Sequence, residues 1–398
     1  MVQLIRSITL LATMIGATAA SCAAKRVPAA FGLVAGRRYR PSAAFRYRSF
    51  HTSPTLLQMT IADTPLGTAP GADLLDGLDI YTVPASEDGH PLTVYGINSN
   101  YDDSSKDGNS NRKPILMLHG RTWSSVPVYH LLGGPKQAAQ KVQGRESRSL
   151  MEALYDVGLQ PYAMDFRGFG GTPRDASRWV EPNRCVADVE TVLKFVAERH
   201  PSGTDESSDD NSDGMPALMG WSQGALVAQL VGQKSPGLMS QLVLYGSIYD
   251  PLISYPRVPL YVENPDRRNE TDVINEYDAA IEDFTVEGSI PPETARLFAE
   301  AALMSDPIKA QWNHLYQFNN CDPARVHVPT LVVAGDQDPY APLRVQSELF
   351  SHLGRGADRS WSIIADADHA VHLLDGRERF VSQVKSFVRN GKKGLGHA

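Results

Sequence analysis

Cysteine is scarce in this sequence, and its scarcity excludes several kinds of protein. The 398 residues include three cysteines, Cys22, Cys185 and Cys321. With Cys22 in a leader, at most one pair remains, which rules out the disulfide framework of small secreted domains. No cysteine belongs to a Cys-x-x-Cys motif, so a zinc or thioredoxin-type site is not expected. The cysteine content favours a reducing compartment.

Acidic residues are missing from residues 1–62. The basic ones there are Arg6, Lys25, Arg26, Arg37, Arg38, Arg40, Arg46 and Arg48. This basic, Ser- and Ala-rich composition is typical of a transit peptide, so residues 1–57 are predicted to target the chain to the mitochondrial matrix. The stretch Arg48–Ser53 resembles the cleavage region of matrix precursors, with a mature start near Gln58. Alternatively, the apolar stretch Ile8–Ala20 acts as a secretory signal, and the protein is secreted with a basic tail.

Long hydrophobic runs and an excess of positive charge are also absent. The apolar stretch Ile8–Ala20 is too short to cross a bilayer as a helix, so no stable membrane span is expected. Residues 63–398 contain 30 basic and 45 acidic side chains, a net charge of −15. Such a body repels nucleic acid phosphates and anionic membranes. The predicted partner is therefore a small molecule and not a nucleic acid, while the oligomeric state stays open.

Short apolar segments alternate with longer periodic ones from about residue 78 onward. The apolar segments suit strands buried on both faces, and they are 114–118, 160–164, 216–219, 241–245, 330–334 and 360–364. Helical periodicity is found in 147–157, 183–200, 223–233, 343–352 and 377–388. This alternation predicts an α/β fold in which helices flank a mostly parallel central sheet.

Three segments interrupt the alternation. Residues 98–113 and 202–214 are polar, lack periodicity and are predicted to be loops or insertions. Residues 251–322 separate two predicted strands by roughly seventy residues, far more than an ordinary connection. They are predicted to form an inserted helical cap on a core made of 58–250 and 323–398. The cap aromatics could line a substrate pocket or form the cap's own core, and they are Tyr255, Tyr261, Trp312, Tyr316 and Phe318.

The pentapeptide Gly220-Trp221-Ser222-Gln223-Gly224 matches the pattern G-x-S-x-G. Its glycines permit a very tight strand-to-helix turn that aims the serine hydroxyl outward, where a flanking side chain would clash. An apolar strand precedes the pentapeptide and an apolar helical stretch, 225–231, follows it. Ser222 is therefore predicted to be a nucleophile and not a serine in an ordinary turn.

A serine hydroxyl is a weak nucleophile unless a base takes its proton during attack. Two histidines, His369 and His372, follow the last predicted strand. His369 comes sooner after the strand and is the predicted base, while His372 is expected to pack or hydrogen-bond beside it. A His-x-x-His metal pair is the alternative, but the sequence offers no clear third ligand.

An acidic residue must orient the imidazole through its other ring nitrogen. Asp336 and Asp338 both follow the strand 330–334 directly. Asp338 is the predicted partner, because Asp336 lies nearer the strand end and suits a role in shaping the turn. Asp250, at the end of another strand, is a further candidate. The order Ser, Asp, His along the chain differs from that of chymotrypsin-like and subtilisin-like enzymes.

The segment His119-Gly120-Arg121-Thr122 follows the strand 114–118. A backbone N–H just past the His-Gly pair could bind a developing oxyanion together with the N–H of Gln223. Arg121 is the predicted first donor, with Thr122 next to it as the alternative. His119 is predicted to brace this loop.

Together these motifs resemble the α/β-hydrolase superfamily, in its cap-bearing, esterase-like branch of serine hydrolases. The matching pieces run in family order from Leu116 to Phe380, and they are LMLHGRTWSS, AMDFRGFGGTPRD, LMGWSQGALVAQL, LVLYGS, LVVAGDQDPYAP and DADHAVHLLDGRERF. The resemblance implies that the loop 165–170 lies near the site with a chiefly structural role. Its glycine spacing does not suit a dinucleotide-binding turn. A serine nucleophile separates the chain from haloalkane dehalogenases and epoxide hydrolases, and the HGGG motif of hormone-sensitive-lipase-like enzymes is absent.

The combined prediction is a serine hydrolase that cleaves a small-molecule carboxylic ester through an acyl-enzyme, without metal or organic cofactor. Ser222, His369 and Asp338 are the expected catalytic residues. The same three residues could also serve a thioesterase, a carbon–carbon bond hydrolase or an acyltransferase. A non-catalytic binding protein on a hydrolase fold is the third possibility, because a fold does not guarantee chemistry.

Overall fold

The computed structural model describes residues 72–98, 112–135, 146–201, 214–250 and 271–390. The predicted targeting segment therefore lies outside the described residues, as do most of the two polar segments. Residues 251–270 of the predicted cap, with Tyr255 and Tyr261, also lie outside them.

An eight-stranded sheet forms the centre of the described structure, with the order β1-β2-β4-β3-β5-β6-β7-β8. The strand β2 is antiparallel to both β1 and β4, and the remaining pairs are parallel. The strands are β1 Leu78–Pro84, β2 Pro91–Ile97, β3 Lys113–Leu118, β4 Leu159–Met164, β5 Ala217–Trp221, β6 Leu242–Tyr245, β7 Thr330–Gly335 and β8 Arg359–Ile364. This architecture confirms the predicted α/β-hydrolase fold with its mostly parallel sheet.

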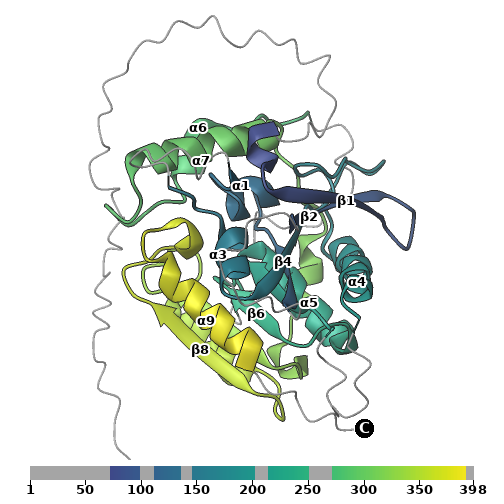
Figure 1. Ribbon diagram of the computed structural model, residues 1–398. Coiled ribbons are helices and arrows are strands. Elements are labelled where there is room, and N and C mark those ends of the chain that lie inside the picture. Colours follow the sequence, from purple (N-terminus) through teal and green to yellow (C-terminus); the bar gives the residue numbers. More distant parts are fainter. Residues whose placement is uncertain (1–71, 99–111, 136–145, 202–213, 251–270, 391–398) are drawn as a thin grey trace, which may run out of the picture. The chain divides into compact units, whose positions relative to one another are not determined.

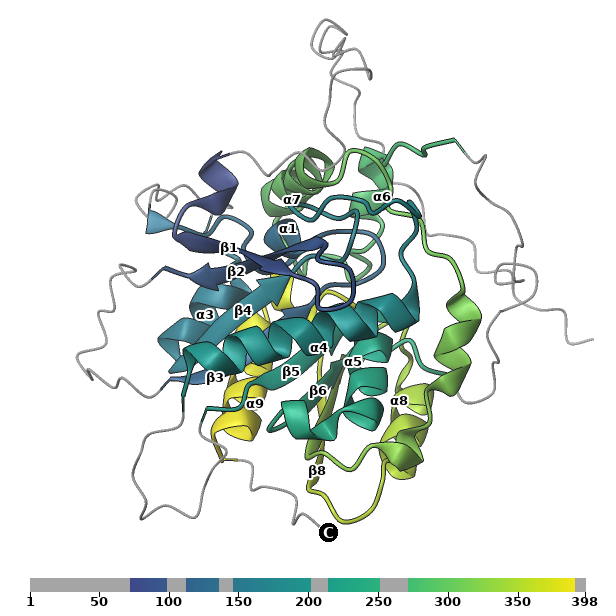
Figure 2. The same ribbon diagram turned by 90° about the vertical axis from the view of Figure 1, so that its right-hand side faces the viewer.

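Helices cover both faces of the sheet (Figures 1 and 2). The α-helices are α1 Ser125–Tyr129, α3 Leu150–Asp156, α4 Pro182–Arg199, α5 Gln223–Lys234, α6 Tyr277–Ile281, α7 Pro292–Ser305, α8 Leu343–His352 and α9 Arg377–Asn390. Short 3₁₀ helices are η1 Ala72–Leu75, η2 Pro236–Leu238, η3 Leu315–Asn320, η4 Pro323–Arg325 and η5 Val371–Leu373. The helices α3 and α9 contact each other on one face, and α4 and α5 contact each other on the other.

The strand β3 shows how the sequence builds two cores. Its side chains alternate between the faces, so Ile115 and Met117 join the apolar cluster that includes α3 and α9. Leu116 and Leu118 join the cluster that includes α4, α5 and α8. All four are fully buried, which explains why this strand reads as an uninterrupted apolar run.

Two features of the sheet differ from the sequence prediction. The hairpin of β1 and β2 was not among the predicted strands. The last strand, β8, was predicted to be buried on both faces, and this is wrong: Trp361 and Ile363 are exposed to 38% and 45%. The reason is that β8 is the edge strand and pairs only with β7, so its outer side chains are only partly covered. Trp361 stacks on Phe350 of α8, with 5.8 Å between ring centroids.

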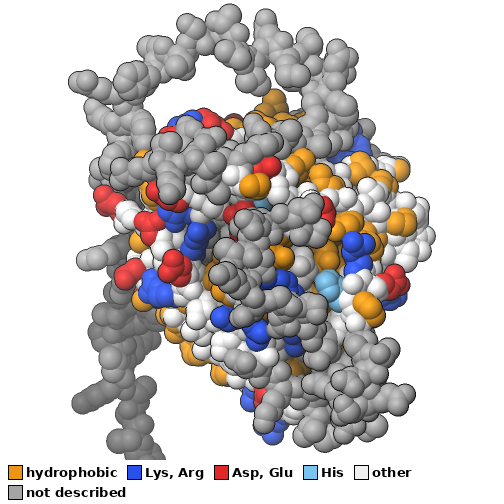
Figure 3. Space-filling view, in the orientation of Figure 1, with side chains coloured by type: hydrophobic (Ala, Val, Ile, Leu, Met, Phe, Trp, Pro, Cys, Tyr) orange, Lys and Arg blue, Asp and Glu red, His pale blue; other side chains and the backbone are white. Residues whose placement is uncertain are grey.

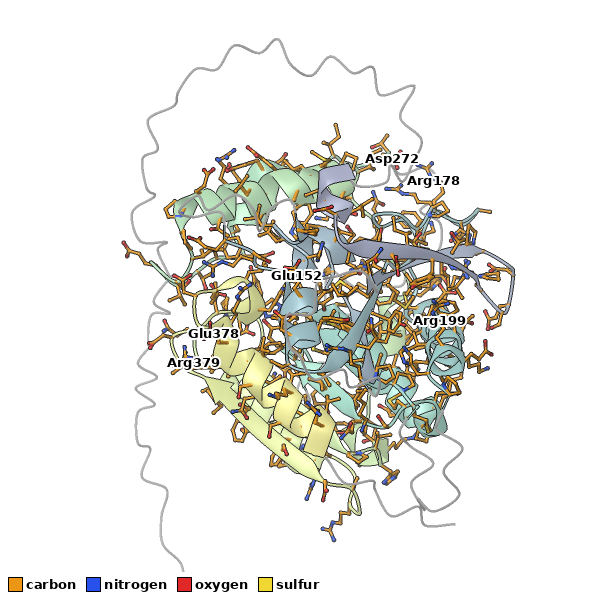
Figure 4. All side chains as sticks on the ribbon, viewed as in Figure 1. Glu152, Arg178, Arg199, Asp272, Glu378 and Arg379 are labelled. Carbon is orange, nitrogen blue, oxygen red and sulfur yellow. The ribbon has the colours of Figure 1, made fainter. Side chains whose placement is uncertain are left out.

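The described part of the predicted cap contains α6, α7 and η3, and α7 contacts α1 of the core. Its beginning is held by an ion pair, because Arg178 Nη2 lies 2.7 Å from the Asp272 carboxylate (Figure 4). Arg174 binds the same carboxylate at 2.8 Å. The described part of the predicted cap therefore has direct polar attachments to the loop that follows β4.

Where described side chains are visible at the left of Figure 3, acidic and basic ones lie next to each other. Among the described helices, none is both long enough and apolar enough to cross a bilayer.

Candidate active site

Ser222 lies at a sharp turn between β5 and α5. Its backbone has φ 58° and ψ −121°, a left-handed conformation that costs a non-glycine residue about 1–3 kcal/mol. A side chain at Gly220 would bring its Cβ within 2.3 Å of Gly224 O, and one at Gly224 would lie 2.3 Å from His119 O. Both glycines are therefore required sterically, as the G-x-S-x-G pattern predicts. Ser222 is thus held at the carboxyl end of the central strand.

His369 and Asp338 meet at the same edge of the sheet, from the loops that follow β8 and β7. His369 Nδ1 lies 2.7 Å from Asp338 Oδ2, and both side chains are almost completely buried. The other carboxylate oxygen, Oδ1, accepts hydrogen bonds from the N–H groups of Tyr340 and Ala341, each at 2.8 Å. The structure therefore brings Asp338 against the imidazole, and neither Asp336 nor Asp250 occupies that place.

Ser222 and His369 line one cleft, whose volume is about 450 Å³. No hydrogen bond joins Ser222 Oγ to the His369 ring among these described residues. Contacts between a serine and its base are often loose before a substrate binds and tighten in the reacting complex. The indole of Trp221 also packs beside the imidazole, with 5.2 Å between ring centroids.

The two other histidines singled out by the sequence are structural. His372 is fully buried, its Nδ1 lies 2.9 Å from Tyr245 Oη, and burial lowers its pKa to about 3. Burial likewise lowers the pKa of His119 to about 3. His119 Nε2 accepts from the N–H of Phe166 and Nδ1 lies 3.0 Å from Gly120 O. Within the described residues, no group of His, Cys, Asp and Glu side chains could hold a metal ion.

The loop that carries the predicted oxyanion donors lies directly beside the candidate nucleophile. A Cβ on Gly120 would come within 3.3 Å of Ser222 Cβ, and Arg121 and Thr122 both line the cleft. Gln223 is the first residue of α5, so its N–H has no acceptor inside the helix. Both predicted backbone positions are therefore next to Ser222.

The walls of the cleft come from several separate parts of the chain. Trp123, Ile248, Pro339 and Tyr340 supply apolar and aromatic surface, whereas Ala279, Glu282 and Asp283 come from the cap. Burial raises the pKa of the Asp283 carboxyl to about 6. Lys309 and Arg121 add positive charge elsewhere on the lining. The cleft thus combines aromatic and apolar walls with several polar and charged groups.

The predicted cap aromatics do not line this cleft where they are described. Trp312 and Phe318 are buried and pack on each other, with 6.2 Å between ring centroids, so they belong to the core. Trp312 also contacts the site indirectly, because its Nε1 donates to Arg121 O at 3.1 Å, in the loop that carries the predicted oxyanion donors. The aromatic walls are instead Trp123, Trp221 and Tyr340, which the sequence analysis had not singled out.

Two buried carboxylates fix the loops behind the cleft. Asp165 accepts from the N–H groups of Ser125 and Gly171 at 2.8 and 2.9 Å, and burial raises its pKa. Asp306, at the end of α7, accepts from Ser124 at 2.8 Å and from Gly170 at 2.9 Å. The loop 165–170 is therefore structural, as the resemblance implied. Asp306 was missed because nothing in its local sequence shows which loops it reaches.

Replacement of Asp306 by Asn is expected to change how stability depends on pH. Burial raises the pKa of this carboxyl from 3.8 to about 7, so between pH 4 and 7 the folded chain holds a proton that the unfolded chain releases. Its contribution to the free energy of unfolding therefore falls as pH rises through that window. Denaturant unfolding at pH 4.5, 6 and 8 measures the free energy of unfolding of the wild type and of Asp306→Asn. As the pH rises, the wild type should lose stability relative to the variant. If the free energies of unfolding of the two proteins changed equally with pH, the raised pKa of Asp306 would be contradicted.

The sheet order, the strained serine turn and the paired His369 and Asp338 define a protein of the α/β-hydrolase fold. The chain belongs to the family described as serine aminopeptidase, S33, whose model matches residues 143–375.

Comparison with known proteins agrees with this fold. A thermophilic esterase from Thermogutta terrifontis superposes with a TM-score of 0.52 at 14% identity, covering 78% of this chain and 98% of that one. A serine hydrolase involved in carbazole degradation gives a TM-score of 0.50 at 17% identity, over 78% and 99% of the two chains. A polyketide synthase of Burkholderia thailandensis is 30% identical over 192 residues, which are 44% of this chain but 9% of that protein. The matched region thus spans under a tenth of the synthase.

Proposed function

We propose that this chain is a serine hydrolase that cleaves a carboxylic ester of a small molecule. The observation that carries the proposal is the 2.7 Å contact between His369 Nδ1 and Asp338 Oδ2 in a cleft that Ser222 also lines. An imidazole held in this way presents Nε2 as the base for a neighbouring hydroxyl. Such a paired histidine beside a strained, outward-facing serine suits nucleophilic catalysis.

The proposed reaction proceeds in two halves. Ser222 Oγ attacks the ester carbonyl while His369 takes its proton, and the N–H groups of Arg121 and Gln223 stabilise the oxyanion. His369 then gives the proton to the leaving alcohol, and an acyl-enzyme remains. A water molecule, deprotonated by His369, then attacks the acyl carbon. The bond to Ser222 Oγ breaks, His369 returns the proton to that oxygen, and the acid is released. The steps use groups of this chain and one water molecule, so the mechanism needs no cofactor.

The cleft supports a substrate of modest size. Its volume of about 450 Å³ falls in the range of small-molecule sites, and its aromatic walls suit an apolar acyl or alcohol group. The solved esterase from Thermogutta terrifontis shares the fold, which is compatible with ester hydrolysis here.

A substrate panel on the purified chain tests the proposed bond. Matched oxygen esters and thioesters with the same acyl groups should show turnover of the oxygen esters, with the free acid as product. Faster hydrolysis of the thioesters would instead assign a thioesterase, and transfer of the acyl group to an added alcohol would assign an acyltransferase. Inertness toward both sets and toward a fluorophosphonate probe would favour a non-catalytic binding protein.

A further inference from the structure

The backbone around His369 is held from the core side. Trp221 Nε1 donates to His369 O at 2.8 Å, and Tyr245 Oη donates to the same oxygen at 3.0 Å. Since Asp338 fixes the ring through Nδ1, the direction of Nε2 depends on where this loop backbone lies. Whatever holds the loop from the opposite side therefore also helps to set the imidazole.

Asp368, the residue before His369, joins this loop to the cap. Its Oδ1 accepts from the N–H of Ala370 at 2.9 Å. Its Oδ2 accepts from the cap N–H groups of Thr285 and Val286 at 2.9 and 3.4 Å. The side chain is fully buried. One carboxylate thus binds backbone donors of two segments that are more than 80 residues apart in the sequence.

The cap segment that Asp368 holds is a wall of the cleft. Glu282 and Asp283 line the cleft directly before the bound N–H groups of Thr285 and Val286. The segment is attached again further on, because Asp375 N donates to Ser289 O at 2.8 Å. Loss of Asp368 would therefore loosen the wall while the rest of the cap stays anchored.

We propose that Asp368 is a positioning residue that fixes the cap wall and the His369 loop in one arrangement. The inference rests on the proposed function, in which His369 is the base. Because the Asp368 carboxylate binds both segments, the position of the imidazole and the position of the cap wall depend on each other. A carboxylate suits this role because it accepts several N–H hydrogen bonds at once and binds them more strongly than a neutral acceptor does.

The test compares Asp368→Ala and Asp368→Asn with the wild type, using the full chain. Asp336→Asn is the matched control, because Asp336 Oδ1 accepts from Ala367 N in the same loop at 3.2 Å. Backbone hydrogen exchange over residues 282–290 reports on the wall without any need for activity. Kinetics are measured with p-nitrophenyl esters of a short and a long acyl group. The kcat reports on the position of His369, and the difference in KM between the two esters reports on the cap wall.

For Asp368→Ala we expect amide exchange in 282–290 to rise by at least about tenfold. We also expect kcat to fall by up to about 10²-fold for both esters, since small misplacements of a catalytic group are costly. KM should rise more for the long ester than for the short one. Asp368→Asn keeps one acceptor and should recover part of each change, and Asp336→Asn should match the wild type in exchange.

Slower turnover without faster exchange in 282–290 would overturn the proposal, because Asp368 would then act within its own loop only. Faster exchange with unchanged kcat would overturn it as well, because the wall and the histidine would be independent. A wild-type chain that hydrolyses no ester would defeat the proposed function, and unchanged exchange in the variants would separately defeat the coupling. If Asp368→Ala does not fold, the same outcomes apply to Asp368→Asn.

Discussion

Replacing Ser222 with Ala is expected to lower kcat for short p-nitrophenyl esters by on the order of 10⁶, as loss of a serine nucleophile does elsewhere. The variant keeps the cleft and the 2.7 Å contact between His369 and Asp338, so only the attacking oxygen is removed. Labelling by a fluorophosphonate should disappear, because that reagent reacts covalently with an activated serine. The free energy of unfolding should not fall, because the hydroxyl is not needed for packing at this turn.

Ser347→Ala is a matched control for this experiment. Ser347 is a partly buried serine on α8 whose Oγ donates to Arg344 O at 2.8 Å, and it does not line the cleft. Its loss should leave both turnover and labelling unchanged. If labelling survives in Ser222→Ala, another nucleophile carries the activity and the assignment of Ser222 is wrong.

The buried parallel strands were predictable because each one is a compact apolar run between turn residues. β3 to β7 have both faces covered, so their sequences show no alternation and stand out from the helices. The strand β1 is different, because its burial alternates along its length. The strand β2 is buried after Pro91, but Thr93 and Gly96 interrupt its apolar residues. Such a strand gives a weaker signal, and which sheet edge it joins depends on contacts distant in sequence.

The positions of Ser222, Asp338 and His369 were predictable for a topological reason. Each follows a parallel strand directly or within one short loop, and the carboxyl ends of parallel strands meet at one edge of the sheet. The choice of Asp338 over Asp336 rested on distance from the strand end, and the structure places Asp338 at the imidazole. Local sequence was sufficient to predict these three residues because the topology of the sheet places their loops at the same edge.

The walls of the cleft were less predictable. Asp306 and Asp368 bind backbone N–H groups 182 and 83 residues away, Asp283 lines the cleft, and no local pattern shows where such segments will lie. The cap aromatics were ambiguous for the same reason. Trp312 could have pointed into the cleft, but it packs on Phe166 and Phe318 and reaches the site only through Arg121 O.

Replacing Asp338 with Asn should keep the fold and lower kcat by on the order of 10⁴, the cost of the wrong histidine tautomer in serine proteases. The structure gives the reason. Oδ1 of Asp338 accepts two backbone N–H groups, from Tyr340 and Ala341, so the amide oxygen of Asn would keep that place. Its NH₂ group would then face His369 Nδ1, which must become an acceptor. The proton moves to Nε2, and the ring can no longer take a proton from Ser222.

Kinetics of the single and double variants separate this mechanism from a loss of structure. Asp336→Asn, in the same loop, should retain near-normal kcat, because its carboxylate binds Ala367 N and not the imidazole. Ser222→Ala combined with Asp338→Asn should be no slower than Ser222→Ala alone, since residues that act as one unit are not additive. Near-normal turnover in Asp338→Asn would assign the orienting role to Asp336 or Asp250. A double variant much slower than Ser222→Ala would mean that Asp338 acts on something other than the base of Ser222.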